Sequence, residues 1–180
     1  MTELPNLGPE PGWHELVPPQ TVAGRSFVSG EPQGDRLRVR YFTSEGGALV
    51  AKVWFGPGAV GPPNHAHGGS LAAVLDEAMG AAAWLAGHVA VAADLHLKFR
   101  QMVPLGTVFM VSTRVTTVDG RKVRTAGTLR SLDGAVTYCE ADGLFIEVDA
   151  EHFGDMAEEA FSVLAGARAD AKSDRDAGEG

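Results

Sequence analysis

The sequence is poor in cysteine and in positive charge. Cys139 is the only cysteine among 180 residues, which excludes an intramolecular disulfide and a cysteine-rich metal site. This usage of cysteine favours a reducing cytoplasm. Lys and Arg number 15 against 23 Asp and Glu, and the formal net charge is -8. The excess of negative charge argues against a general binder of nucleic acid or of anionic membranes.

The sequence also lacks a long apolar segment. The run of residues 78–93 contains no Asp, Glu, Lys or Arg, but Gly80, Gly87 and His88 interrupt it. Because a bilayer-spanning helix needs about 20 predominantly apolar residues, no such helix is expected. The first residues, MTELPNLGPEPGW, have neither a basic segment nor an apolar core, so a signal peptide is not expected either. We expect a soluble cytoplasmic protein.

The sequence does contain a series of segments in which apolar and polar residues alternate, as they do in half-buried strands. These segments are residues 36–42, 48–55, 91–101, 108–118, 121–130 and 136–148. Gly46-Gly47, Asp119-Gly120 and Asp133-Gly134 separate three pairs of neighbours and favour hairpin turns, because glycine accepts positive φ. The pattern predicts a first hairpin and, later, a meander of long antiparallel strands.

Two features of these strands concern what packs on them. Along residues 91–101, Leu95, Leu97 and Phe99 share one face and are expected to point toward the core. Small residues inside the last two strands leave room for a helix to lie across the sheet. They are Gly127, Ala141 and Gly143.

Residues 62–87, PPNHAHGGSLAAVLDEAMGAAAWLAG, predict a proline turn, then the His67-Gly68-Gly69 step and, from there, one long helix of nearly five turns. Between Ser70 and Ala86 the only polar side chains are those of Ser70, Asp76 and Glu77, and a helix that is apolar all round is a buried helix. Asp76 is the anomaly, because burying a carboxylate without a partner costs free energy. Glu77 lies about 100° further round the helix and is expected to point away from that face, in a secondary role.

The order of these elements predicts an α+β fold, with an antiparallel sheet of about six strands wrapped around one long central helix. Trp13 and Phe27 are expected to pin the proline-rich N-terminal arm to this domain. Because one sheet covers only one side of the helix, a second copy of the chain is expected to cover the other side. The chain then divides into an irregular arm (1–34), the central domain (35–148), a short surface helix (149–165) and a disordered acidic tail (166–180).

Several of these features together resemble the hotdog-fold acyl-CoA thioesterases, in the branch of the PaaI-type and THEM-type enzymes. They are the His67-Gly68-Gly69 step at the helix start, the Asp nine residues after this His, the helix of small residues, and the later segments DGRK and LFIEV. The resemblance covers roughly residues 45–148. It implies a hotdog fold and a homodimer, or a dimer of dimers, that hydrolyses an acyl-CoA to a free acid and CoA without a metal or other cofactor.

The backbone N–H groups of Gly68, Gly69 and Ser70 open the predicted helix. They are expected to lack intrahelical partners and to lie at the positive end of the helix dipole, where they can stabilise an oxyanion. The alternative is that Gly68-Gly69 serves only as a tight turn into the helix. Asp76 lies about 10 Å from Gly69 along the helix axis, so one carbonyl cannot contact both. We therefore expect a composite site, with Asp76 supplied by the other subunit.

Asp76 is predicted to act as a general base on water or as a nucleophile that forms a mixed anhydride. His67 is predicted to orient the substrate carbonyl or the thioester sulfur, although a histidine here can also serve only to bond the helix backbone. Asn64 and His65 are candidates for polar gate residues.

The family often has a Ser or Thr on the strand after the helix. This chain has Ala92-Ala93-Asp94 there, without a hydroxyl, and Ser70 or Asp94 could take over its role of positioning water. The missing hydroxyl motivates a second hypothesis, a non-catalytic acyl-CoA-binding or interaction module on the same fold. A third, a hotdog dehydratase, requires a catalytic His with a carboxylate and a hydration motif that this sequence does not show.

An acidic protein that binds coenzyme A needs local cations for its phosphates. The candidates are Lys98, Arg100, Arg121, Lys122 and Arg124, which fall near predicted strand ends. The alternative for each is an ordinary solvated charge on a strand.

Overall fold

A computed structural model describes residues 5–18, 26–29, 31, 33–154, 162 and 166. Its elements are β1 (His14–Leu16), β2 (Leu37–Thr43), β3 (Leu49–Phe55), the 3-10 helix η1 (Pro57–Ala59), α2 (Gly68–Leu85), β4 (Ala90–Phe99), β5 (Val108–Asp119), β6 (Lys122–Ser131), β7 (Thr137–Glu147) and the 3-10 helix η2 (Ala150–Phe153). The six predicted strands and the long helix are all present. The short strand β1, inside the N-terminal arm, was not predicted.

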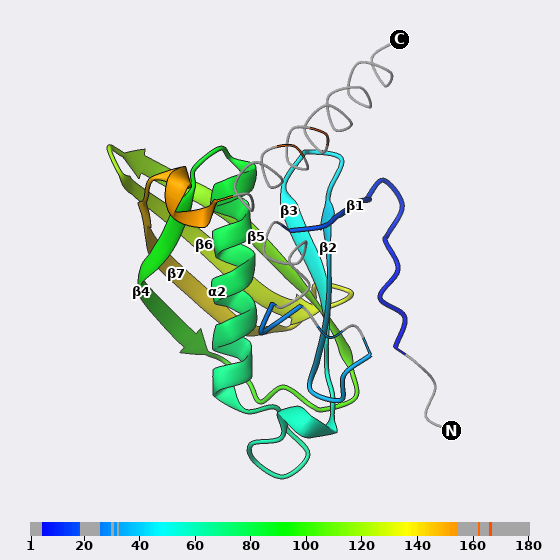
Figure 1. Cartoon of the computed structure of the whole chain (residues 1–180). Coiled ribbons are helices and arrows are strands. Elements are labelled where there is room, and N and C mark those ends of the chain that lie inside the picture. Colours follow the sequence, from blue (N-terminus) through cyan, green and yellow to red (C-terminus); the bar gives the residue numbers. More distant parts are fainter. Residues whose placement is uncertain are drawn as a thin grey trace.

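The strands form one seven-stranded antiparallel sheet in the order β1-β2-β3-β5-β6-β7-β4. Helix α2 leaves the β3 side of the sheet and leads to β4, which pairs with β7 at the opposite edge (Figure 1). The predicted α+β hotdog architecture is confirmed. The strand count is seven because β1 adds to β2 outside the predicted six.

Helix α2 lies across the concave side of the curved sheet (Figure 1). Val74, Leu75, Ala78 and Met79 on its inner face are completely buried. They pack into one core cluster with side chains from the sheet, including Phe109 of β5. The alternating pattern of the strands thus supplies the apolar floor on which an alanine-rich helix can lie closely.

Glycines in the strands make this close approach possible. A Cβ atom at Gly127 would lie 3.0 Å from the Met79 sulfur and 3.2 Å from Leu75 Cδ2, and one at Gly143 would lie 2.7 Å from Met79 Cε. The prediction that these small residues leave room for the helix is therefore confirmed.

The N-terminal arm is attached through contacts on the β2–β3 hairpin. The ring of Trp13 lies 5.6 Å from that of Phe42, and the carboxylate of Glu10 pairs at 2.5 Å with the buried ammonium group of Lys52. The prediction for Trp13 is confirmed. Phe27 does not act as the second pin in this chain, because its side chain is 84% exposed.

Strand β4 follows its predicted pattern in part. Leu95 and Leu97 pack against the core, as expected, whereas Phe99 is 57% exposed. Phe99 is the last residue of an edge strand, and its ring extends toward the start of α2, where a Cβ atom at Gly68 would lie 3.4 Å from it. Phe99 therefore belongs to the surface around the helix start rather than to the core.

The C-terminal predictions are only partly covered. Residues 150–153 form η2, and all five apolar positions of the predicted surface helix lie outside the described residues, as does nearly all of the predicted tail. Those positions are Met156, Ala157, Ala160, Phe161 and Leu164. In the part of the chain that is described, no helix combines the length and apolarity needed to cross a membrane.

We predict that Gly127→Val lowers the free energy of unfolding by about 1–3 kcal/mol, because the added methyl groups meet Met79 and Leu75 in a packed core. The measurement is urea unfolding followed by circular dichroism. Gly46→Val is the matched control, since nothing lies within 4 Å of a Cβ there, and it should change the same quantity by less than about 1 kcal/mol. Equal effects of the two substitutions would contradict the packing argument.

Candidate active site

The start of α2 is organised by His67, which is the N-cap residue. Its Nδ1 atom accepts a hydrogen bond from the N–H of Gly69 at 2.9 Å. Its carbonyl oxygen accepts bonds from the N–H of Ser70 at 2.9 Å and from the Ser70 hydroxyl at 2.6 Å. One residue therefore satisfies most of the polar groups in the first helical turn.

This arrangement differs from the expectation that Gly68, Gly69 and Ser70 all present free N–H groups. Of these three N–H groups, only that of Gly68 has no acceptor among the described residues, because His67 accepts the hydrogen bonds of the other two. Gly68 is also the first residue of the helix, at the positive end of its dipole. A carbonyl oxygen bound here would be contacted by Gly68 first.

The same contact determines which nitrogen of His67 can donate. In a neutral imidazole one ring nitrogen accepts and the other donates. Since Nδ1 accepts from Gly69, Nε2 is the nitrogen that carries the proton. The His67 ring is exposed, so this N–H is available to a bound molecule.

Asn64 and His65 lie in the turn that leads into the helix. Asn64 has a left-handed backbone with φ of 63°, and its carbonyl accepts a bond from the N–H of Leu105 at 3.0 Å. His65 Nδ1 lies 2.8 Å from the carbonyl oxygen of Pro63. Both residues are thus at the same end of the helix as His67, held by the chain that follows β4.

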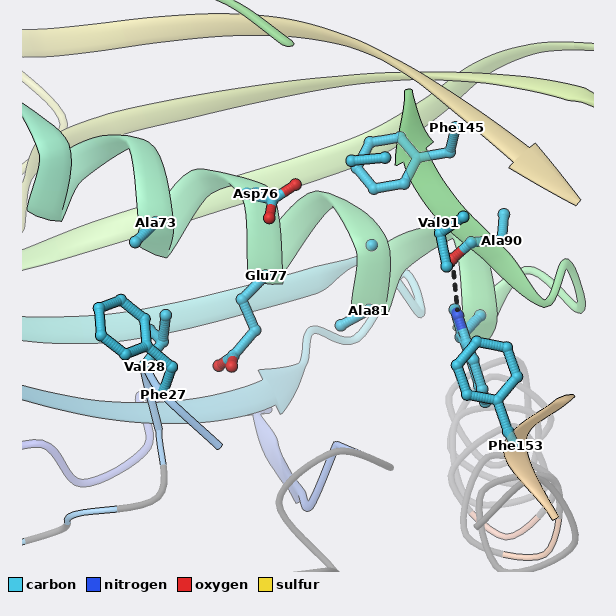
Figure 2. Close-up of a pocket in the computed structure, with 13 residues that line it drawn as sticks. Phe27, Val28, Ala73, Asp76, Glu77, Ala81, Ala90, Val91, Phe145 and Phe153 are labelled. Carbon is cyan, nitrogen blue, oxygen red and sulfur yellow. Dashed lines mark hydrogen bonds between the residues drawn. The ribbon is translucent and has the colours of Figure 1, made fainter. Parts of the chain in front are cut away.

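Asp76 lies in the middle of α2 and is half-buried. Its carboxylate has no hydrogen-bond or ion-pair partner among the described residues, and burial raises its pKa above the usual value. It lines a pocket of about 400 Å³ between α2, β4 and β7, shown in Figure 2. An unpaired carboxylate at an apolar pocket is the arrangement that the sequence anomaly suggested.

Glu77 lines the same pocket, but its charge is already engaged. One carboxylate oxygen accepts a hydrogen bond from the Tyr41 hydroxyl at 2.9 Å, and the other accepts a short one from the Ser26 hydroxyl. In Figure 2 the two carboxylates point in different directions from the helix. Glu77 is therefore a structural tie between the helix, β2 and the arm, and Asp76 is the reactive candidate.

Sequence reasoning missed Tyr41 and Ser26 as partners of Glu77. Tyr41 is almost fully buried, and burial together with the Glu77 charge raises the pKa of its phenol well above the usual value. A tyrosine at an inward position of a strand needs a partner for its hydroxyl, which was the available signal. Ser26 gave no such signal, since it lies in an irregular segment.

Ala92 lies on β4 and lines the same pocket as Asp76. No side-chain hydroxyl lines this pocket among the described residues. The Ser70 hydroxyl donates to a backbone carbonyl at the helix start, and Asp94 is exposed beyond the irregular step in the pairing of β4 with β7. The structure thus shows no substitute for the hydroxyl in the described part of one protomer.

No group of three or more side chains that could hold a metal ion occurs among the described residues.

The candidate cations fall into separate places. Arg100 pairs with Glu140 at 2.6 Å near the end of β4, and Lys98 is exposed beside it. Arg121 instead donates to the carbonyl of Glu147 at 2.8 and 3.0 Å. Lys122, exposed on β6, lies near the start of β4, so about 25 Å of strand separates the two groups. The exposed Arg124 follows on β6. One protomer does not bring these cations to one place.

Comparison with known proteins places these features in a family. The model of the thioesterase superfamily matches residues 63–138. Over 164 residues the chain is 32% identical to acyl-coenzyme A thioesterase THEM5 of Mus musculus. This alignment covers 78% of this chain and 65% of THEM5. Over 94 residues it is 38% identical to acyl-coenzyme A thioesterase THEM4 of Xenopus laevis, and this alignment covers 52% of this chain and 42% of THEM4.

Solved structures agree with the sequence relatives. A crystal structure of a thioesterase superfamily protein superimposes with a TM-score of 0.61 at 30% identity, covering 67% of this chain and 59% of that one. The chain spans only 65% and 42% of the lengths of the two THEM proteins. From the superfamily match, these relatives and the arrangement of sheet and helix, the chain belongs to the hotdog-fold thioesterase superfamily, and its sequence is similar to the THEM-type members.

Proposed function

We propose that this protein is an acyl-CoA thioesterase, which hydrolyses the thioester of an acyl-CoA to a free acid and CoA. The observation that carries the proposal is the carboxylate of Asp76, which is half-buried, unpaired among the described residues and placed at an apolar pocket. The names of the sequence relatives, acyl-coenzyme A thioesterases, support the same substrate class.

In the proposed reaction Asp76 acts as the general base. It accepts a proton from a water molecule, whose oxygen bonds to the thioester carbonyl carbon, and the carbonyl oxygen becomes an oxyanion. The C–S bond then breaks, and the CoA thiolate leaves and takes up a proton. Burial supports the base rather than the nucleophile role, because a raised pKa brings the carboxylate closer to the pH at which a base is effective.

The proposed oxyanion donor is the N–H of Gly68, with Nε2–H of His67 as a second donor to the carbonyl or the sulfur. In one protomer Gly68 and Asp76 are about 12 Å apart along the helix, too far to act on one carbonyl. Strand β4 is an edge of the sheet; Val91 and Phe99 on this strand are exposed, as is Met102 in the loop after it. We therefore place the site in a homodimer, with Gly68 of one subunit near Asp76 of the other.

Phosphate binding is part of this proposal. In a two-fold dimer, exposed cations from different subunits can surround one site although one protomer separates them. Lys98 and Lys122 fit this role best, because Arg100 and Arg121 already donate to protein oxygens. Asn64 and His65 lie at the helix start, where they can line the entrance.

A second candidate is an acyl-CoA-binding module without turnover. It is favoured by Ala92 and by the absence of a hydroxyl among the described residues that line the pocket. Binding of acyl-CoA without release of thiol by the wild-type protein would support this candidate over the enzyme.

We predict that Asp76→Asn lowers kcat for thiol release from acyl-CoAs by at least about 100-fold, because it removes the base. Short, long and aryl acyl-CoAs should all be assayed. Asp142→Asn, at an exposed position on β7, is the matched control and should retain activity. Equal rates for wild type and Asp76→Asn would overturn the assignment.

The same variant should not be less stable at pH 7. A folded-state pKa raised above the unfolded one gives a contribution to stability that is present at low pH and lost as pH rises through the folded pKa. At pH 7 the Asp76 charge therefore opposes folding, and the neutral Asn removes this cost. Urea unfolding should give an equal or larger free energy for Asp76→Asn, which separates loss of chemistry from loss of fold.

We predict that kcat/KM falls on the acidic side with a pKa above that of an exposed Asp, about 3.9, because the base must be ionised and burial raises its pKa. A pH profile of thiol release measures this limb. Any residual activity of Asp76→Asn should not show this decrease of kcat/KM at acidic pH. A limb at or below the range of exposed carboxyls would argue against Asp76 as the base.

We predict that Gly68→Pro and Asp76→Asn complement each other in mixed dimers. Proline is tolerated at the first helical position, and His67, with φ of -67° and ψ of 136°, has the backbone that a residue before proline requires. The substitution thus removes the Gly68 N–H and should lower kcat by about 100- to 1,000-fold. Gly68→Ala, which keeps the N–H, should lose less.

Random mixing of the two inactive variants makes half of the dimers mixed, and each mixed dimer has one intact site. The mixture should therefore recover about a quarter of the wild-type activity, measured after unfolding and refolding the two variants together. No recovery from two inactive variants would show that Gly68 and Asp76 act within one protomer.

A further inference from the structure

The pocket beside Asp76 is long and follows one face of α2. Its helical lining residues follow the pattern i, i+3, i+4, i+7, i+8 and i+11, which puts them on one side of the helix over three turns. They are Ala73, Asp76, Glu77, Gly80, Ala81 and Trp84. From Asp76 to Trp84 the helix rises about 12 Å. Because Gly80 and Ala81 between them are small, a flexible chain can lie along this stretch.

Aromatic rings close one end of the pocket. The Trp84 ring meets that of Phe153 edge to face, with centroids 5.2 Å apart, and the Trp84 indole N–H donates to the carbonyl of Ala90 at 3.1 Å. Figure 2 shows Phe145 and Phe153 at this end, and Phe27 at the other, with Asp76 between them. The indole is fixed by its hydrogen bond, so Phe153 is held against a rigid partner.

The closed end offers nothing for a polar ligand group to pair with. Three described lining residues have polar side-chain atoms, and two of them are already engaged. Glu77 accepts from Tyr41 and Ser26, and the Trp84 N–H is bonded to Ala90. Only Asp76 is left, at the position of the proposed chemistry. A polar or charged chain would lose its hydrogen bonds to water without replacement, whereas an alkyl chain would not.

We propose that this pocket holds the aliphatic chain of the acyl-CoA, running from the carbonyl at Asp76 to the Trp84–Phe153 pair, and that Phe153 limits the length of the chain. The proposal rests on the proposed function and specifies its substrate class. Phe153 belongs to η2, so the residue proposed to set the chain length lies outside the sheet and the long helix.

The test is calorimetric binding of non-hydrolysable S-alkyl-CoA thioethers of increasing chain length to the full-length protein. For wild type, affinity should rise by about fourfold with each added methylene until the chain reaches Phe153, and then stop rising. Phe153→Ala should move this limit to longer chains. Gly80→Val should move it to shorter chains, because the added side chain would enter the pocket near Phe145, whose Cε1 lies 3.3 Å from a Cβ at this position.

Leu132→Ala is the control, since Leu132 is exposed next to the β6–β7 turn and does not line the pocket. An unchanged limit in Phe153→Ala, with melting temperature retained, would overturn the proposal, as would a wild-type affinity that does not depend on chain length. Chain-length-dependent binding without release of thiol from acyl-CoAs would instead reject the thioesterase function and leave the pocket assignment standing.

Discussion

Burial of an alanine-rich helix against the concave face of the sheet is the constraint on which the rest of the structure depends. The helix can approach so closely because Gly127 and Gly143 leave space for the large inner side chains of Leu75 and Met79. The sheet covers only one side of the helix. The other side is left with a pocket, a carboxylate that no described residue pairs with, and an exposed edge strand, which are the features from which the proposed site is built.

Two neighbouring carboxylates on this helix show how differently the same chemistry can be used. Glu77 accepts hydrogen bonds from two hydroxyls and ties the arm and β2 to the helix. Asp76 has no partner among the described residues, and its burial disfavours the charged form. Protein stability is thus served by Glu77, whereas Asp76 costs stability at neutral pH. Such a cost is expected where a reactive group must stay available.

The helix start divides its polar groups in a similar way. His67 accepts the N–H of Gly69 and, through its carbonyl, the N–H of Ser70, which leaves Gly68 as the open donor. The same hydrogen bond fixes the protonated nitrogen of the His67 ring. The His-Gly-Gly step therefore does more than supply a flexible turn, because the histidine determines which backbone donor and which ring nitrogen stay open among the described residues.

The sequence by itself determined six of the strands and their succession along the chain, the limits of the helix, the glycines beneath it and the unusual position of Asp76, because all of these follow from local periodicity and from the chemistry of single residues. Only the tertiary structure decided that β4 lies at the edge, that Glu77 is engaged by residues 36 and 51 positions away, and that Phe153 closes the pocket. It also placed the candidate cations, all expected near strand ends, at separate positions on one protomer. These features depend on contacts between segments distant in the chain, and no local pattern encodes which distant segments will meet.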